Sequence, residues 1–114
     1  MSSGTGKKLC TDEVIRRAQK FIGLNYHKNL TLETVAGITG LSTNYFLAYF
    51  KQKAGISFQK YLTQIRIEKA MKLLKESNLS SEAISAEVGY ENPNYFIRVF
   101  KKETGMTVSE SRKK

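Results

Sequence analysis

One face of the helix predicted over residues 93–104 carries an amide, a guanidinium and an ammonium group. Asn94, Arg98 and Lys101 are spaced by four and three residues, which places them on the same side of a helix. Asparagine can form two hydrogen bonds with adenine and arginine two with guanine, while a lysine farther along reaches a phosphate. The pattern indicates a surface that reads nucleic acid, and the simpler alternative is a solvated helix face.

The other side of this helix is predicted to face the core, because three of its four residues are apolar. Packing of that side would turn Asn94 and Arg98 outward, with Ile97 and Lys102 flanking them. The expected core side consists of Phe96, Val99, Phe100 and Glu103.

A helix predicted over residues 43–54 has the same layout but a less polar outer face. Asn44 could bind adenine, while Leu47 and Ala48 could contact thymine methyl groups. Leu47 could equally pack against another domain. We therefore expect the later helix to contribute more hydrogen-bonded specificity than this one. The expected core side consists of Phe46, Tyr49, Phe50 and the stem of Lys53.

Phosphate contacts are expected at the start of both helices and along their outer faces. Ser42 with Thr43, and Asn92, stand where free backbone N–H groups and the helix dipole favour an anion. Helix capping is the first role of these side chains. The other expected phosphate contacts are Lys51, Lys101 and Lys102.

The chain carries few groups that could perform catalysis or bind a metal. Cys10 is the only cysteine and His27 the only histidine, so neither a disulfide within the chain nor a zinc site with the usual ligand spacing is expected. We find no nucleophile–base pair and no phosphate-binding loop, and predict no catalytic residue, metal or cofactor.

Composition favours a folded domain with an anionic partner. The 114 residues include 19 Lys and Arg against 10 Asp and Glu, which gives a net charge of +9. Nucleic acid is the first candidate partner and an anionic membrane surface the second. No apolar run approaches the roughly 20 residues of a membrane span, and no signal peptide is recognisable, so we expect a cytoplasmic protein without membrane contact.

Apolar spacing and capping residues predict seven helices and no strand. The longest is expected over residues 58–76, where apolar side chains occupy most of the circumference. The expected first residues or caps of the seven helices are Thr11, Thr31, Ser42, Ser57, Ser80 or Ser81, Asn92 and Thr107.

A pair consisting of a short helix and a longer one occurs twice, which indicates two helix-turn-helix units. Solenoid hairpins are the alternative, but these normally come in three or more copies. The matched residues are Tyr45-Phe46 with Tyr95-Phe96, Phe50-Lys51 with Phe100-Lys101 and Gly55 with Gly105, each offset by 50 positions.

The long helix between the two units could set their separation. A helix of this size is about 30 Å long, and successive major-groove faces on one side of B-DNA lie about 34 Å apart. It could instead pack across the molecule and set another angle. The expected organisation is a flexible lead or linker remnant over residues 1–8, a first subdomain over 9–56, a connector over 57–77 and a second subdomain over 78–114.

Over residues 9–112 the sequence resembles the DNA-binding domain of the AraC/XylS family of bacterial transcription regulators. The connector and the first unit fit this pattern, but the second unit carries the most specific match. Its matching residues are Ile84, Val88-Gly89-Tyr90, Asn94-Tyr95-Phe96, the run from Arg98 to Thr107, and Arg112.

The resemblance implies double-stranded DNA as the ligand, bound by two helices in adjacent major grooves, and activation through RNA polymerase. It also implies an N-terminal effector-binding or receiver domain outside this chain. The readout positions that it implies are Asn44, Leu47 and Ala48 in the first unit, and Pro93, Asn94, Tyr95, Ile97 and Arg98 in the second.

Four positions depart from the family pattern. Ser85 replaces a usual alanine, and Ala48 stands where arginine is common. Val108 replaces a common proline and Ser111 a common aromatic residue, so we expect a loosely anchored final helix. The sequence predicts a DNA-binding transcription regulator without enzymatic activity; the alternative is a basic helical module that docks onto proteins.

Overall fold

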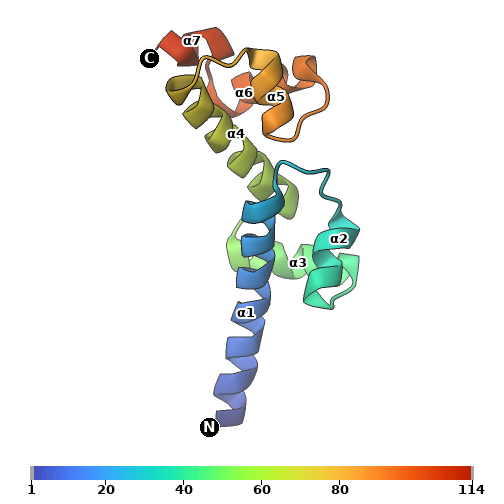
Figure 1. The fold of residues 1–114 in the computed structure, drawn as a ribbon. Coiled ribbons are helices and arrows are strands. Elements are labelled where there is room, and N and C mark those ends of the chain that lie inside the picture. Colours follow the sequence, from blue (N-terminus) through green and yellow to red (C-terminus); the bar gives the residue numbers. More distant parts are fainter. Residues whose placement is uncertain (1, 114) are drawn as a thin grey trace. The chain divides into compact units, whose positions relative to one another are not determined.

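The structure, a computed structural model, describes the backbone of residues 2–113 and the side chains of residues 13–113. Every regular element in this range is an α-helix, which confirms the predicted all-α fold (Figure 1). The seven helices of the described chain are α1 (Ser2–Asn25), α2 (Leu32–Thr39), α3 (Thr43–Ala54), α4 (Phe58–Glu76), α5 (Ser81–Glu87), α6 (Pro93–Thr104) and α7 (Val108–Lys113).

The start of α1 differs from the prediction. The helix begins at Ser2, and Thr11, the expected cap, lies inside it. The preceding residues include no proline, and an established helix extends one hydrogen bond at a time past a residue that only favours capping. The helical backbone therefore covers residues 2–8, where we expected a flexible lead. That this segment is a linker remnant stays a prediction.

The other helix starts follow the predicted caps closely. Thr31, Ser42 and Ser80 each accept a backbone N–H three residues ahead with their hydroxyl oxygen. Asn92 accepts two, and Pro93 takes the first helical position, where its missing N–H costs nothing. Helices α2, α3 and α6 end at the predicted glycines Gly40, Gly55 and Gly105, all in the left-handed conformation.

Residue contacts divide the chain into two compact units. The first unit comprises Met1–Asn25 and Leu30–Tyr61, and the second comprises Tyr26–Asn29 and Leu62–Lys114. The division falls inside α4, because the first turn of this helix packs on α3: the ring centroids of Phe50 and Tyr61 lie 5.3 Å apart. The loop over residues 26–29 belongs to the second unit, although helices of the first unit precede and follow it in sequence.

Both units have a core built on two phenylalanines of the longer helix in the pair. Phe46 and Phe50 of α3 have no solvent exposure, and neither do Phe96 and Phe100 of α6. In the first unit α1 packs against α2 and α3, and buries Ile15, Ala18 and Ile22 (Figure 1). In the second unit the buried cluster is Ile67, Ala70, Leu74, Ile84, Val88, Tyr90, Phe96, Phe100 and Val108.

The expectation of a loosely anchored final helix was wrong. Val108 and Ser111 of α7 are buried, so small side chains fill these two positions without exposing them. The guanidinium of Arg112 donates hydrogen bonds to the carbonyl oxygens of Ser77, at 3.1 Å, and Leu79. A capping box also fixes the start of α7, since the carboxylate of Glu110 accepts the backbone N–H of residue 107 at 2.8 Å.

Ser85, another position that departs from the family pattern, is fully buried, and its hydroxyl is hydrogen-bonded. Its hydroxyl donates to the carbonyl oxygen of Tyr90 at 3.1 Å, and the Tyr90 backbone N–H donates to the Ser85 carbonyl oxygen at 2.9 Å. A buried hydroxyl is tolerated when it is hydrogen-bonded. The serine therefore closes the turn between α5 and α6 with one more hydrogen bond than alanine would.

Replacing Phe100 by alanine should destabilise the second unit. Removal of a fully buried phenyl ring leaves a cavity in a packed core, and we expect a loss of about 3–5 kcal/mol in the free energy of unfolding. Urea denaturation followed by helical circular dichroism measures this. Lys101→Ala, at the exposed neighbouring position, is the control and should change stability by less than about 0.5 kcal/mol. Equal stabilities of the two variants would contradict the role of Phe100 in the core.

Candidate nucleic-acid interface

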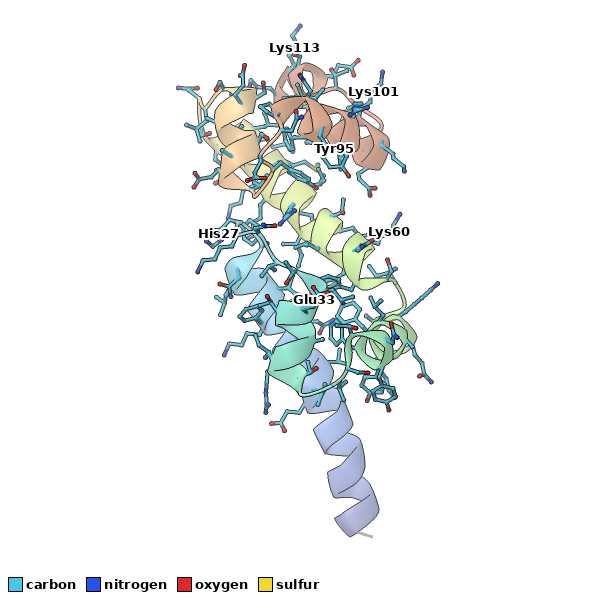
Figure 2. All side chains as sticks on the ribbon, turned by 90° about the vertical axis from the view of Figure 1, so that its right-hand side faces the viewer. His27, Glu33, Lys60, Tyr95, Lys101 and Lys113 are labelled. Atoms are coloured by element: carbon cyan, nitrogen blue, oxygen red, sulfur yellow. The ribbon has the colours of Figure 1, made fainter. Side chains whose placement is uncertain are left out.

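The buried and exposed sides of α6 lie where the sequence predicted them. Phe96 and Phe100 are fully buried, and Val99 and Glu103 on the same side are half-buried. The outward residues, which include Tyr95 and Lys101 as labelled in Figure 2, are Asn94, Tyr95, Ile97, Arg98, Lys101 and Lys102, and all of them are exposed. Amide, phenol, guanidinium and ammonium groups thus share one solvent-facing surface.

Aromatic contacts hold the most prominent of these residues in place. Tyr95 is 51% exposed, and its ring meets the buried side of the turn through Tyr90, with ring centroids 5.9 Å apart. Tyr90 in turn packs on Phe96 at 5.6 Å. The guanidinium carbon of Arg98 lies 6.0 Å from the centroid of the Tyr95 ring, within the range of a weak cation–π contact. The exposed Arg98 side chain is therefore in contact with Tyr95, which itself packs on Tyr90.

The start of α6 is capped by the side chain of Asn92. The Oδ1 atom of Asn92 accepts the backbone N–H groups of Asn94, at 2.9 Å, and Tyr95, at 3.3 Å. This confirms the capping role, which uses only the oxygen of the Asn92 amide. A phosphate contact at this helix start stays a prediction.

The outer face of α3 is less polar, as expected. Asn44 and Ala48 are exposed, and Leu47 is half-buried within this chain. Ser42 is exposed and caps the helix through its hydroxyl, which accepts the Tyr45 backbone N–H at 3.3 Å, and Thr43 beside it is half-buried. Lys51 is also exposed. The face offers one amide and one ammonium group where α6 offers a guanidinium in addition.

Two details of α3 differ from the sequence prediction. Tyr49 is half-buried where we expected a core residue, and Lys53 is exposed, with its ammonium nitrogen 5.8 Å from the centroid of the Tyr49 ring. Tyr45 was missed as a candidate: it is 58% exposed and stacks on Tyr49 with ring centroids 5.9 Å apart. The internal repeat carried the missing signal, because Tyr45 matches Tyr95 at the offset of 50.

Arg66 of α4 organises the region beside the start of α6. Its Nε atom donates to the carbonyl oxygen of Tyr26 at 2.8 Å and its second terminal nitrogen to that of Lys28 at 2.9 Å. The guanidinium carbon lies 5.2 Å from the centroid of the Tyr90 ring. Burial lowers the pKa of Arg66, and Tyr90 opposes part of this change. Burial likewise raises the pKa of the Tyr90 phenol. Nothing in the sequence indicated this contact.

Among the described residues, no group of three or more His, Cys, Asp or Glu side chains could hold a metal ion. Within the same range, no helix is both long enough and apolar enough to cross a membrane.

Comparison with known proteins places this geometry in a family. A family model described as a helix-turn-helix domain matches residues 35–114. The lactose operon transcription activator of Staphylococcus xylosus is 36% identical over 101 residues, which cover 89% of this chain and 36% of that protein. The chain spans 24% to 59% of the length of the first curated relatives that it matches.

Solved structures with the same fold include domains of known transcription regulators. The C-terminal domain of AraT, a response regulator from Geobacillus stearothermophilus, is 39% identical with a TM-score of 0.85, and the match covers 88% of this chain and 84% of that one. The DNA-binding domain of AdpA, solved in complex with a target DNA, shares the fold at 22% identity with a TM-score of 0.76, covering 90% of this chain and 88% of that one. The chain therefore belongs to the AraC-type family of helix-turn-helix transcription regulators, and corresponds to its DNA-binding domain.

Proposed function

We propose that this chain binds double-stranded DNA in a sequence-specific manner, with α3 and α6 as the two helices that enter the major groove. The observation that carries the proposal is the exposed polar face of α6, which stands directly opposite two fully buried phenylalanines. The same arrangement recurs in α3 with fewer polar groups.

The division of labour follows from the side chains on the two faces. On α6, Asn94 and Arg98 read base edges with Tyr95 and Ile97 beside them, while the lysines and Asn92 bind phosphates. On α3, Asn44 reads adenine, and Leu47 and Ala48 contact thymine methyl groups. The phosphate ligands at α3 are Ser42, Thr43 and Lys51.

The wider function of the parent protein extends this proposal. Related chains include a transcription activator and the output domain of a response regulator, which supports activation of transcription by a protein that carries an effector or receiver domain as well. The activator would contact RNA polymerase and work in the cytoplasm, at the nucleoid. The domain itself would act by binding alone, without catalysis, cofactor or metal.

Salt dependence distinguishes DNA binding from the alternative, a basic module that docks onto proteins. Phosphate contacts release counterions, so the logarithm of the association constant should fall with the logarithm of salt concentration, with a slope of about −0.9 per contact. Fluorescence anisotropy with a labelled duplex, between about 50 and 200 mM salt, measures the slope. A flat dependence, or no binding to duplex at the lowest salt, would contradict the proposal.

Arg98→Ala should weaken binding to the preferred sequence by about 1–3 kcal/mol and relax the preference at one base pair, because a bidentate contact to a base is lost. Lys101→Ala removes the same charge one helical turn away and should weaken all sequences alike. Competition between single-base variants of the duplex measures both effects. If Arg98→Ala kept the full base preference, Arg98 would have to be removed from the set of reading residues.

A further inference from the structure

A hollow of about 390 Å³ opens in the second unit beside the start of α6. It adjoins the exposed face of α6 that carries Asn94, Arg98 and Lys101, which we call the reading face. His27 and Asn29 line it from the loop that follows α1, Arg66 from α4, and Tyr95 from α6 (His27 and Tyr95 are labelled in Figure 2). These four residues, which we call the hollow cluster, come from distant parts of the sequence. Tyr95 belongs to both the hollow and the reading face.

The loop is held firmly against the second helix-turn-helix. Two hydrogen bonds from Arg66 fix the carbonyl oxygens of Tyr26 and Lys28. Gly89, in the turn between α5 and α6, has φ +103°, and a Cβ atom there would lie 2.7 Å from the Tyr26 carbonyl oxygen. This close approach needs a glycine. The backbone of the loop is thus fixed, which lowers the backbone entropy lost when its side chains bind a ligand.

The chemistry of the hollow cluster suits an anion with several oxygen atoms. Imidazole, carboxamide, guanidinium and phenol groups all donate hydrogen bonds, and the guanidinium adds a positive charge. Arginine, asparagine and tyrosine side chains are among the donors that bind the phosphate oxygens of DNA. Tyr95 also belongs to the face that we propose to bind DNA. The backbone phosphates of that DNA are therefore the nearest candidate anions for the hollow cluster.

We propose that the hollow cluster seats a phosphate group of the DNA backbone next to the segment read by α6. This inference rests on the proposed function, and it extends the DNA contact to a loop that precedes both helix-turn-helix motifs in sequence. This phosphate contact fixes the position of the protein along the DNA backbone and adds no sequence preference of its own.

One residue that lines the hollow carries a negative charge and should repel a bound anion. Its neutralisation should therefore change the affinity for DNA in the opposite direction from the loss of a donor. Glu91 reaches the same hollow from the turn before α6. A carboxylate near a bound phosphate weakens it, and surface charges act over roughly 8 Å at physiological salt. Glu91→Gln should therefore tighten DNA binding severalfold, whereas substitutions that remove donors should weaken it.

The test uses the full chain and a duplex recovered by selection from a random library with the unaltered protein. Asn29→Ala and His27→Ala should each weaken binding by about 10- to 100-fold, the loss expected for one hydrogen bond to a charged group. The loss should be equal for the selected duplex and a scrambled one. Asn78→Ala is the matched control, because Asn78 lies in the loop between α4 and α5 that Arg112 holds in the same way, and it should bind as the unaltered chain does. Glu68→Gln, an exposed glutamate of α4, is the charge control for Glu91→Gln.

Duplexes with a single methylphosphonate, which neutralises one backbone position, locate the seat. One position near the α6 segment should weaken binding by the unaltered chain and have a smaller effect on Asn29→Ala. Identical methylphosphonate profiles for both proteins, or unchanged affinity of all three hollow variants, would overturn the seat while leaving the proposed function intact. Failure of the unaltered chain to select any duplex would overturn both.

Discussion

The burial of two phenylalanines four residues apart holds each of the helices α3 and α6 that we propose to read DNA, and the rest of the proposed interface depends on it. Phe96 and Phe100 hold one side of α6 against the core, so Asn94, Arg98 and Lys101 on the other side face solvent. Phe46 and Phe50 do the same for α3. Each pair also packs against a neighbouring ring. Phe96 contacts Tyr90 in the turn between α5 and α6, and Phe50 contacts Tyr61 in the first turn of α4. The surface proposed to recognise DNA is thus positioned by core packing.

Local signals in the sequence were sufficient to predict most helix limits and the two faces of α6. A cap such as Asn92 followed by Pro93, or a glycine such as Gly105 that must adopt a left-handed conformation, acts within a few residues and can be recognised without the fold. The start of α1 escaped prediction because a favourable cap does not oblige a helix to begin there. The anchoring of α7 escaped it as well, because Arg112 reaches carbonyl groups more than 30 residues away in sequence.

The candidate site shows the same contrast between local and distant information. Exposure of Asn94, Arg98 and Lys101 follows from helical spacing alone, and it is confirmed. Arg66 looked like one charge on a long helix, and its two bonds to the loop before α2 depend on the tertiary fold. Two arginines, Arg66 and Arg112, hold the two loops that enter the short helices, so the repeat extends to loop anchoring although the arginines themselves do not match at the offset of the repeat.

We propose above that α3 and α6 of one chain bind the same duplex. Selection of duplexes from a random library, with the chain as a monomer, is the decisive measurement. We expect a site with two preferred segments whose centres lie about one helical turn, or roughly 10 base pairs, apart, and with the stronger preference in the segment bound by α6. A single short preferred segment, or enrichment without any sequence preference, would contradict it.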